Sequence, residues 1–219
     1  MFKWLRSGSG DAMADVAKVF LGMLTDGRHV FDLAMRARLG QAPAAELEDD
    51  LVRSEERTDD AEQRLRRLVL VHASVHGATD IPACLMYMSV AKDAERVSDL
   101  SKNIFGIAES VAAPGPGPLR DDLIRLHAEI APMIDEAARI FGDDDVTSAH
   151  GFIDRARSLQ AHCRGRIDEL LRGEGDTAQP VAAALTYRHL SRIASNLLNV
   201  TSAVVVPLDR LDYPDDEAD

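Results

Sequence analysis

Aromatic residues and cysteine are scarce in this sequence, and long apolar runs are missing. Phe, Trp and Tyr make up 5% of the 219 residues, whereas apolar residues as a whole make up 46% and charged residues 28%. Sheet cores are usually rich in aromatic and β-branched side chains, so this balance favours helices packed through Ala and Leu. The composition is too apolar for a disordered chain, so we expect one or two packed domains.

The two cysteines, Cys84 and Cys163, lie far apart within apolar helical patterns. We therefore expect reduced core thiols and no disulfide framework. No apolar stretch reaches the length of a membrane span. The apolar and basic start, residues 1–6, is followed by Ser-Gly-Ser-Gly, so we expect no secretion signal. These features predict a cytoplasmic protein.

Basic residues are outnumbered by acidic ones, 25 against 37, which gives a net charge of −12. Because an acidic surface repels phosphate backbones, we expect no nucleic-acid binding. Such a surface suits cations or a partner with a basic face. Part of the acidic excess lies in residues 207–219, which we interpret as a solubilising tail.

Apolar residues recur at steps of three and four along most of the chain, which predicts long amphipathic helices. Gly40 and Pro43 interrupt this pattern, as do Gly77–Asp80. The alternating prolines and glycines of residues 113–118 cannot continue a helix, so we expect a domain boundary there. The expected helices span residues 11–39, 81–112, 119–141 and 146–172, with one more from residue 43 or 44 to residue 76 and a last one from residue 177 or 180 to residue 206.

No window alternates with period two, so we predict no strands. The predicted fold is all-α, with two tandem three-helix bundles. The expected divisions are a flexible N-terminus at residues 1–10, a first bundle at 11–112, a Pro/Gly linker at 113–118, a second bundle at 119–206 and an acidic tail at 207–219.

The two halves of the sequence resemble each other around their third helices. Residues 93–104 align with residues 189–200 without a gap, so that Asn103 meets Asn199. Similar segments on the two sides of the linker indicate a pseudo-twofold internal repeat.

Two rows of carboxylates stand out as a candidate site. Glu95 and Asp99 are four residues apart, so they share one face of the third predicted helix. Glu55, Asp59 and Glu62 line one face of the second. If these helices are adjacent, the five carboxylates converge into a site that suits Mg, Ca, Mn or Fe ions. A solvated acidic face is the alternative.

Motifs of the common enzyme classes are absent from the sequence. His72 and His76 lie one turn apart but lack the Glu of a His-Glu-x-x-His motif, so we interpret them as exposed histidines near a helix end. No Glu-x-x-His occurs, which argues against a ferritin-like di-iron oxidase. There is no Walker A loop, dinucleotide fingerprint or nucleophile turn. We therefore expect no enzymatic activity.

The segment around Glu95 resembles the signature of the PhoU family. Residues 91–100 read Ala-Lys-Asp-Ala-Glu-Arg-Val-Ser-Asp-Leu and are followed by Asn103-Ile104 and Ala108-Glu109. The family signature is close to Asp-Leu-Glu-Arg-Ile-Gly-Asp-His-Ala, followed by Asn-Ile-Ala-Glu. The six-helix pattern extends the resemblance over nearly the whole chain, with specific motifs in the first half and faint ones in the second.

This resemblance implies a cytosolic negative regulator of phosphate uptake and phosphate-starvation signalling, built from two three-helix bundles. The implied partners are a phosphate transporter component, a sensor histidine kinase, or both, and membrane association occurs only through them. We also expect a homodimer. Two alternatives remain open from the residues themselves. They are a carboxylate-bridged metalloenzyme in a helical bundle and a helical adaptor unrelated to phosphate.

By the same resemblance, Glu95 and Asp99 form the first copy of a Glu/Asp-x-x-x-Asp motif that holds iron or zinc clusters in several family members. In the second repeat, Ser191 and Ser195 replace the two carboxylates. Neutral hydroxyls are weak ligands for such ions. We therefore expect a divalent or iron-type metal ion at the first repeat only.

Overall fold

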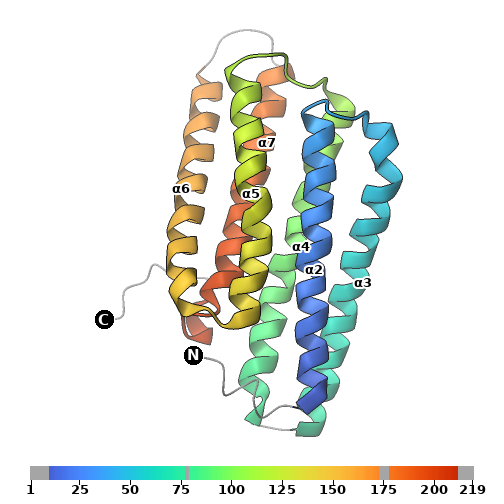
Figure 1. Cartoon of the computed structure of the whole chain (residues 1–219), viewed down its shortest axis with the longest axis vertical. Helices are drawn as coiled ribbons and strands as arrows, with labels where there is room; N and C mark the ends of the chain where they lie inside the picture. The colour runs from blue at the N-terminus through green and yellow to red at the C-terminus, as the bar shows by residue number, and fades with distance from the viewer. Residues whose placement is uncertain (1–9, 77–78, 173–177, 212–219) are drawn as a thin grey trace.

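The computed structural model describes residues 10–76, 79–172 and 178–211. These residues form six long helices and one 3-10 turn, with no strand among them (Figure 1). The helices are α2 (Gly10–Arg38), α3 (Ala44–His76), α4 (Ile81–Ser110), α5 (Pro118–Asp143), α6 (Val146–Leu171) and α7 (Ala178–Ser202), followed by η2 (Leu208–Arg210). The all-α prediction is therefore confirmed. The expected flexible start and acidic tail fall mostly on residues 1–9 and 212–219, outside the described residues.

Glycine and proline set the helix boundaries that the sequence predicted. Gly40, with a φ of +64°, follows α2 in the left-handed conformation that glycine adopts at little cost. A Cβ at this position would lie 2.8 Å from the Cβ of Ala113 in the linker, so the close approach also needs glycine. Pro118 occupies the first turn of α5, where its missing N–H costs no hydrogen bond.

The first bundle consists of α2, α3 and α4, each of which contacts the other two. Its core is dominated by α2, which is buried along most of its length because it lies between α3, α4 and the second bundle. Fully or almost fully buried side chains from the three helices include Val16, Phe20, Phe31, Leu51, Leu65, Val97 and Ile104.

The second bundle, α5 to α7, packs against the first through equivalent helices. The first helices of the two halves, α2 and α5, contact each other, and so do the third helices, α4 and α7. This pairing is what a pseudo-twofold repeat predicts. Phe20, Tyr87 and Phe141 form an aromatic cluster across the junction, with a Phe20–Phe141 centroid distance of 4.6 Å. The two bundles therefore share one continuous core.

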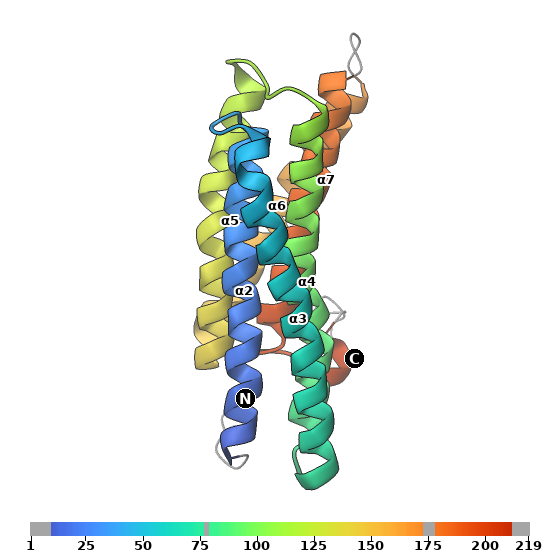
Figure 2. The same ribbon diagram turned by 90° about the vertical axis from the view of Figure 1, so that its right-hand side faces the viewer.

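The first bundle is longer than the second at one end. The end of α3 and the start of α4 extend beyond α5 in both views (Figures 1 and 2). Among the described residues, none of the helices has the length and apolarity needed to cross a membrane. Cys84 and Cys163 are buried free thiols, as the sequence predicted.

Candidate functional site

The five predicted carboxylates lie on α3 and α4, which run side by side in the first bundle. The side chains of Glu55, Glu62 and Glu95 are 14%, 13% and 12% exposed, whereas Asp59 and Asp99 are exposed. The three glutamates are therefore partly withdrawn from water, which strengthens every charge interaction that they make. We call these five residues the acidic cluster.

Basic side chains of the same helices neutralise the three glutamates. Lys102 Nζ of α4 lies 2.6 Å from Glu55 Oε1 of α3 and joins the two helices. Lys92 Nζ lies 2.7 Å from Glu95 Oε2, one turn away on α4. Glu62 accepts a hydrogen bond from Arg66, at 2.7 Å. The cluster is thus an alternating arrangement of charges rather than a purely acidic face.

The pKa values of Asp59 and Glu95 are both raised, by burial and in part by neighbouring carboxylates. Desolvation, followed by the charges of Glu55 and Glu62, raises the pKa of Asp59. Burial also raises the pKa of Glu95, against the opposing hydrogen bond from Lys92, and the charges of Glu62 and Asp99 add to the rise. The charge of Glu62 on α3 therefore reaches Glu95 on α4 across the helix pair.

The donor chemistry of the acidic cluster fits a hard cation, because all of its ligands are carboxylate oxygens. Among the described residues, however, no three His, Cys, Asp or Glu side chains are placed so that they could hold one metal ion. Lys92 and Lys102 stand where a cation would neutralise Glu95 and Glu55. A metal ion would therefore have to displace these ammonium groups.

The corresponding helix of the second bundle presents a different surface. Ser191 of α7 is 9% exposed, and Ser195 is half-buried. Further along the same helix, Asn199 donates a hydrogen bond of 2.9 Å to Asp93 of α4. This part of α7 is therefore engaged in packing between the bundles.

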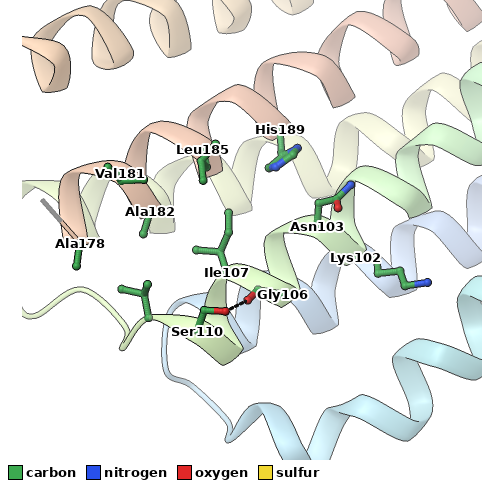
Figure 3. A pocket seen from close by; sticks show the side chains of 11 residues that line it. Lys102, Asn103, Gly106, Ile107, Ser110, Ala178, Val181, Ala182, Leu185 and His189 are labelled. Carbon is green, nitrogen blue, oxygen red and sulfur yellow. Dashed lines mark hydrogen bonds between the residues drawn. The ribbon is translucent and has the colours of Figure 1, made fainter.

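A cleft of about 610 Å³, which was not predicted from the sequence, lies between α4 and α7. Asn103 and His189 lie at one end, and apolar side chains such as Ile107 and Leu185 line the rest (Figure 3). Lys102, which binds Glu55, also lines the cleft, so the cleft borders the acidic cluster. Helices that are distant in sequence form this cleft, so no local pattern could predict it.

The interpretation of His72 as an exposed residue was wrong. Its side chain is 1% exposed, its Nε2 lies 2.8 Å from Asp80 Oδ2, and its ring stacks on that of His76 at a centroid distance of 4.1 Å. The reversal of the chain between α3 and α4 places Asp80 over the last turns of α3, which covers the imidazole. The acidic residue eight positions later was the signal that sequence reasoning missed.

Sequence reasoning also missed a network around Asp122 at the start of α5. Tyr187 of α7 donates a hydrogen bond of 2.7 Å to Asp122 Oδ2, and His162 Nε2 of α6 lies 2.9 Å from the same oxygen. Arg125 donates to Oδ1 at 2.8 Å. Burial alone would raise the pKa of Asp122, but the bonds from Tyr187, His162 and Arg125 outweigh it and lower the pKa. Asp122 thus ties the three helices of the second bundle together.

Comparison with known proteins finds a similar family model for part of the chain and a similar fold for nearly all of it. Residues 21–108 match the family model described as the PhoU domain. The chain is similar to the crystal structure of the phosphate transport system regulatory protein PhoU from Streptococcus pneumoniae, with a TM-score of 0.72 and 14% sequence identity. The similarity covers 95% of this chain and 100% of that one. No curated protein matches the sequence at a significant level. The matched residues contain the whole acidic cluster.

Proposed function

Because residues 21–108 are a PhoU domain and the whole chain has the fold of a PhoU protein, we propose that this protein is a negative regulator of phosphate uptake and phosphate-starvation signalling. The domain match carries the proposal, since it includes the segment around Glu95 on which the sequence resemblance rests. The protein acts without catalytic turnover, by binding other proteins in the cytoplasm. Its partners are a phosphate transporter component, a sensor histidine kinase, or both, and it is a homodimer.

A reporter for a phosphate-starvation gene tests this function in cells. Deleting the gene for this protein should raise reporter expression when phosphate is plentiful, and a plasmid copy of the wild-type gene should lower it again. A reporter that stays low in the deletion strain, together with unchanged phosphate uptake, would refute the proposal.

We further propose that the acidic cluster takes up a divalent or iron-type metal ion, and that this happens at the first repeat only. Several carboxylates are needed to offset the hydration that such a cation loses. Glu95 and Asp99 would hold the ion with support from the row on α3, once Lys92 and Lys102 move aside. The serines of the second repeat offer no comparable charge.

Metal analysis after purification without chelators tests this prediction. The wild type should contain metal, the double variant Glu95→Ala/Asp99→Ala should lose it, and the matched variant Ser191→Ala/Ser195→Ala should keep it. Replacing Lys102 by Ala should tighten binding of added Mn²⁺ in calorimetry, because its ammonium group competes for Glu55. Metal that survives the carboxylate substitutions would show that the assignment is wrong.

A further inference from the structure

An apolar groove of about 490 Å³ lies between the second half of α3 and the first half of α4. Leu70 on the α3 side is 68% exposed, and Leu85 and Met88 on the α4 side are 51% and 37% exposed. The groove belongs to the end of the first bundle that extends beyond the second (Figures 1 and 2). Large apolar side chains are therefore exposed to solvent at this end, which the second bundle does not cover.

Exposed apolar side chains gather at this end of the molecule. Within the described residues, six of the twelve exposed large hydrophobic side chains fall between positions 70 and 88. They are Leu70, Val71, Val75, Ile81, Leu85 and Met88. Single exposed apolar residues are ordinary, whereas a contiguous patch marks an interaction site.

The charge around the groove is opposite to that of the whole molecule. Arg66 and Arg67 line the groove and no acidic residue in the described part of the chain lines it, whereas the whole chain carries a net charge of −12. Asp80 is the one acidic residue between Arg66 and Met88 in the sequence. Asp80 is buried against His72 and contributes little to the surface. The groove thus has a basic margin in an otherwise acidic protein.

Two arginines of α3 form part of the groove itself. Arg66 is bound to Glu62, at 2.7 Å. Arg67 lines the groove and has no acidic partner within the described residues. An unpaired guanidinium beside an apolar surface is suited to a carboxylate of a binding partner.

The spacing of the lining residues defines the shape of the occupant. Ile81, Leu85 and Met88 recur at i, i+4 and i+7 on α4, and Arg66, Leu70 and Ala73 recur in the same way on α3. Side chains at this spacing form ridges, and a third helix can pack into the groove between two such helices. Amphipathic helices bind apolar grooves in this way. The lining spans eight residues of each helix, or about 12 Å at 1.5 Å per residue, so two to three helical turns fit.

We propose that this groove, formed by residues 66–73 and 81–88, binds an amphipathic helix of a partner protein that carries acidic residues beside its apolar stripe. The inference deepens the proposed function, because it names the surface and the type of partner helix through which the regulator acts. An anionic membrane fits less well, because Glu62 and the rest of the acidic cluster continue along the same two helices. A concave surface also suits a single helix better than a bilayer.

Fluorescence anisotropy with the purified full-length chain tests the groove. The probe is a labelled helical peptide with Leu at i, i+4 and i+7 and with flanking Glu residues. The matched peptide has Lys in place of each Glu. The Glu peptide should bind about tenfold more tightly than the Lys peptide, and rising salt should reduce the difference.

Substitutions should locate the binding site. Leu85→Glu and Arg67→Glu should each weaken binding of the Glu peptide about tenfold or more, because each places a carboxylate at an apolar or basic contact. Leu171→Glu is the control, since Leu171 is 75% exposed on α6, in the other bundle. It should bind like the wild type. Circular dichroism should show the same helicity for all variants. A variant that keeps its helicity but binds the peptide weakly has lost binding and not its fold.

Equal binding of the two peptides, no binding of either, or binding that Leu85→Glu leaves unchanged would overturn the proposal. Retention on phosphatidylglycerol vesicles without peptide binding would assign the groove to a membrane instead. Light scattering that shows a dimer in the wild type and a monomer for Leu85→Glu, without peptide binding, would assign it to a second copy of the chain. None of these measurements uses phosphate regulation, so their failure leaves the reporter test of function intact.

Discussion

Arg38 places a guanidinium in the interior of the molecule. It is fully buried at the end of α2, and no carboxylate lies within ion-pair distance of it among the described residues. Its Nε donates to Thr186 Oγ1 of α7 at 3.2 Å, and its Nη1 donates to the carbonyl oxygen of Ala112 at 3.4 Å. Burial lowers the pKa of Arg38. The side chain therefore links α2, the segment that follows α4, and α7.

Truncation of Arg38 should expose this structural role. We expect Arg38→Ala to lower the free energy of unfolding by about 3 kcal/mol, because it leaves a cavity and unpaired acceptors. Arg38→Met should cost less, since it fills the volume and removes a buried charge. Guanidinium chloride unfolding followed by circular dichroism measures both. Equal losses for the two variants would contradict a role based on packing.

The Asp122 network predicts a pH-dependent contribution to stability. The pKa of Asp122 is lowered in the folded state, so its stabilising effect is fully present above the unfolded Asp value of about 3.9 and is lost as the pH falls from there through the lower folded pKa. We expect Asp122→Asn to lower the free energy of unfolding by about 1–3 kcal/mol at pH 7 and by less at pH 3. Urea unfolding of the two proteins at both pH values provides the comparison. A loss that does not change with pH would be inconsistent with this account.

Helix boundaries, in contrast, follow mainly from local sequence. Gly40, Pro43 and Pro118 act through their own backbone preferences, so their effects could be predicted without knowing what packs around them. The end of α7 was less predictable. It was expected at Val206, but the helix ends at Ser202. Three consecutive β-branched valines disfavour helix there, and Ser202 Oγ donates to the carbonyl oxygen of Leu211 in the returning chain.

Two glycines of the α2 region should respond in opposite ways to the same substitution. Gly40→Ala should lower the free energy of unfolding by about 1–3 kcal/mol, because it combines left-handed strain with a 2.8 Å approach to Ala113. Gly22 lies inside α2 with no heavy atom within 4 Å of an added Cβ. Gly22→Ala should therefore raise stability by up to about 1 kcal/mol. Thermal unfolding of the pair tests this difference, and a stable Gly40→Ala variant would be the contrary result.

The sequence identified the acidic cluster but not its surroundings. Periodicity placed Glu95 and Asp99 on one helix face, and that inference needed only the 3.6-residue repeat. The counter-ions were not foreseen, because Lys102 reaches Glu55 only when α3 and α4 lie side by side. The burial of His72 likewise depends on Asp80 in the next helix.

At the scale of the whole molecule, the two bundles form one body. Asp93 and Asn199 form a hydrogen bond across the α4–α7 junction. Their equivalents under the internal repeat, His189 and Asn103, line the cleft between the same two helices (Figure 3). The internal repeat could be predicted from the alignment of residues 93–104 with residues 189–200. The packing of the bundles against each other was not, because it depends on contacts such as Phe20–Phe141 between distant segments.

The distribution of charge and apolar surface over the molecule agrees with a protein that acts by binding others. The acidic cluster and the apolar groove with its basic margin follow each other along α3 and α4, within residues 21–108 that match the PhoU domain. One helix pair thus combines the candidate metal site and the candidate partner surface. A metal ion that displaced Lys92 would change the charge one turn from the groove.

Phosphate uptake in cells tests the central claim most directly. Uptake of labelled phosphate should be measured in phosphate-replete cells of the wild type, of the deletion strain and of the deletion strain with the gene restored. If the protein restrains uptake, the deletion strain should take up phosphate faster, and the restored gene should return the rate to that of the wild type. Equal rates in all three strains, with starvation genes equally silent, would contradict the account.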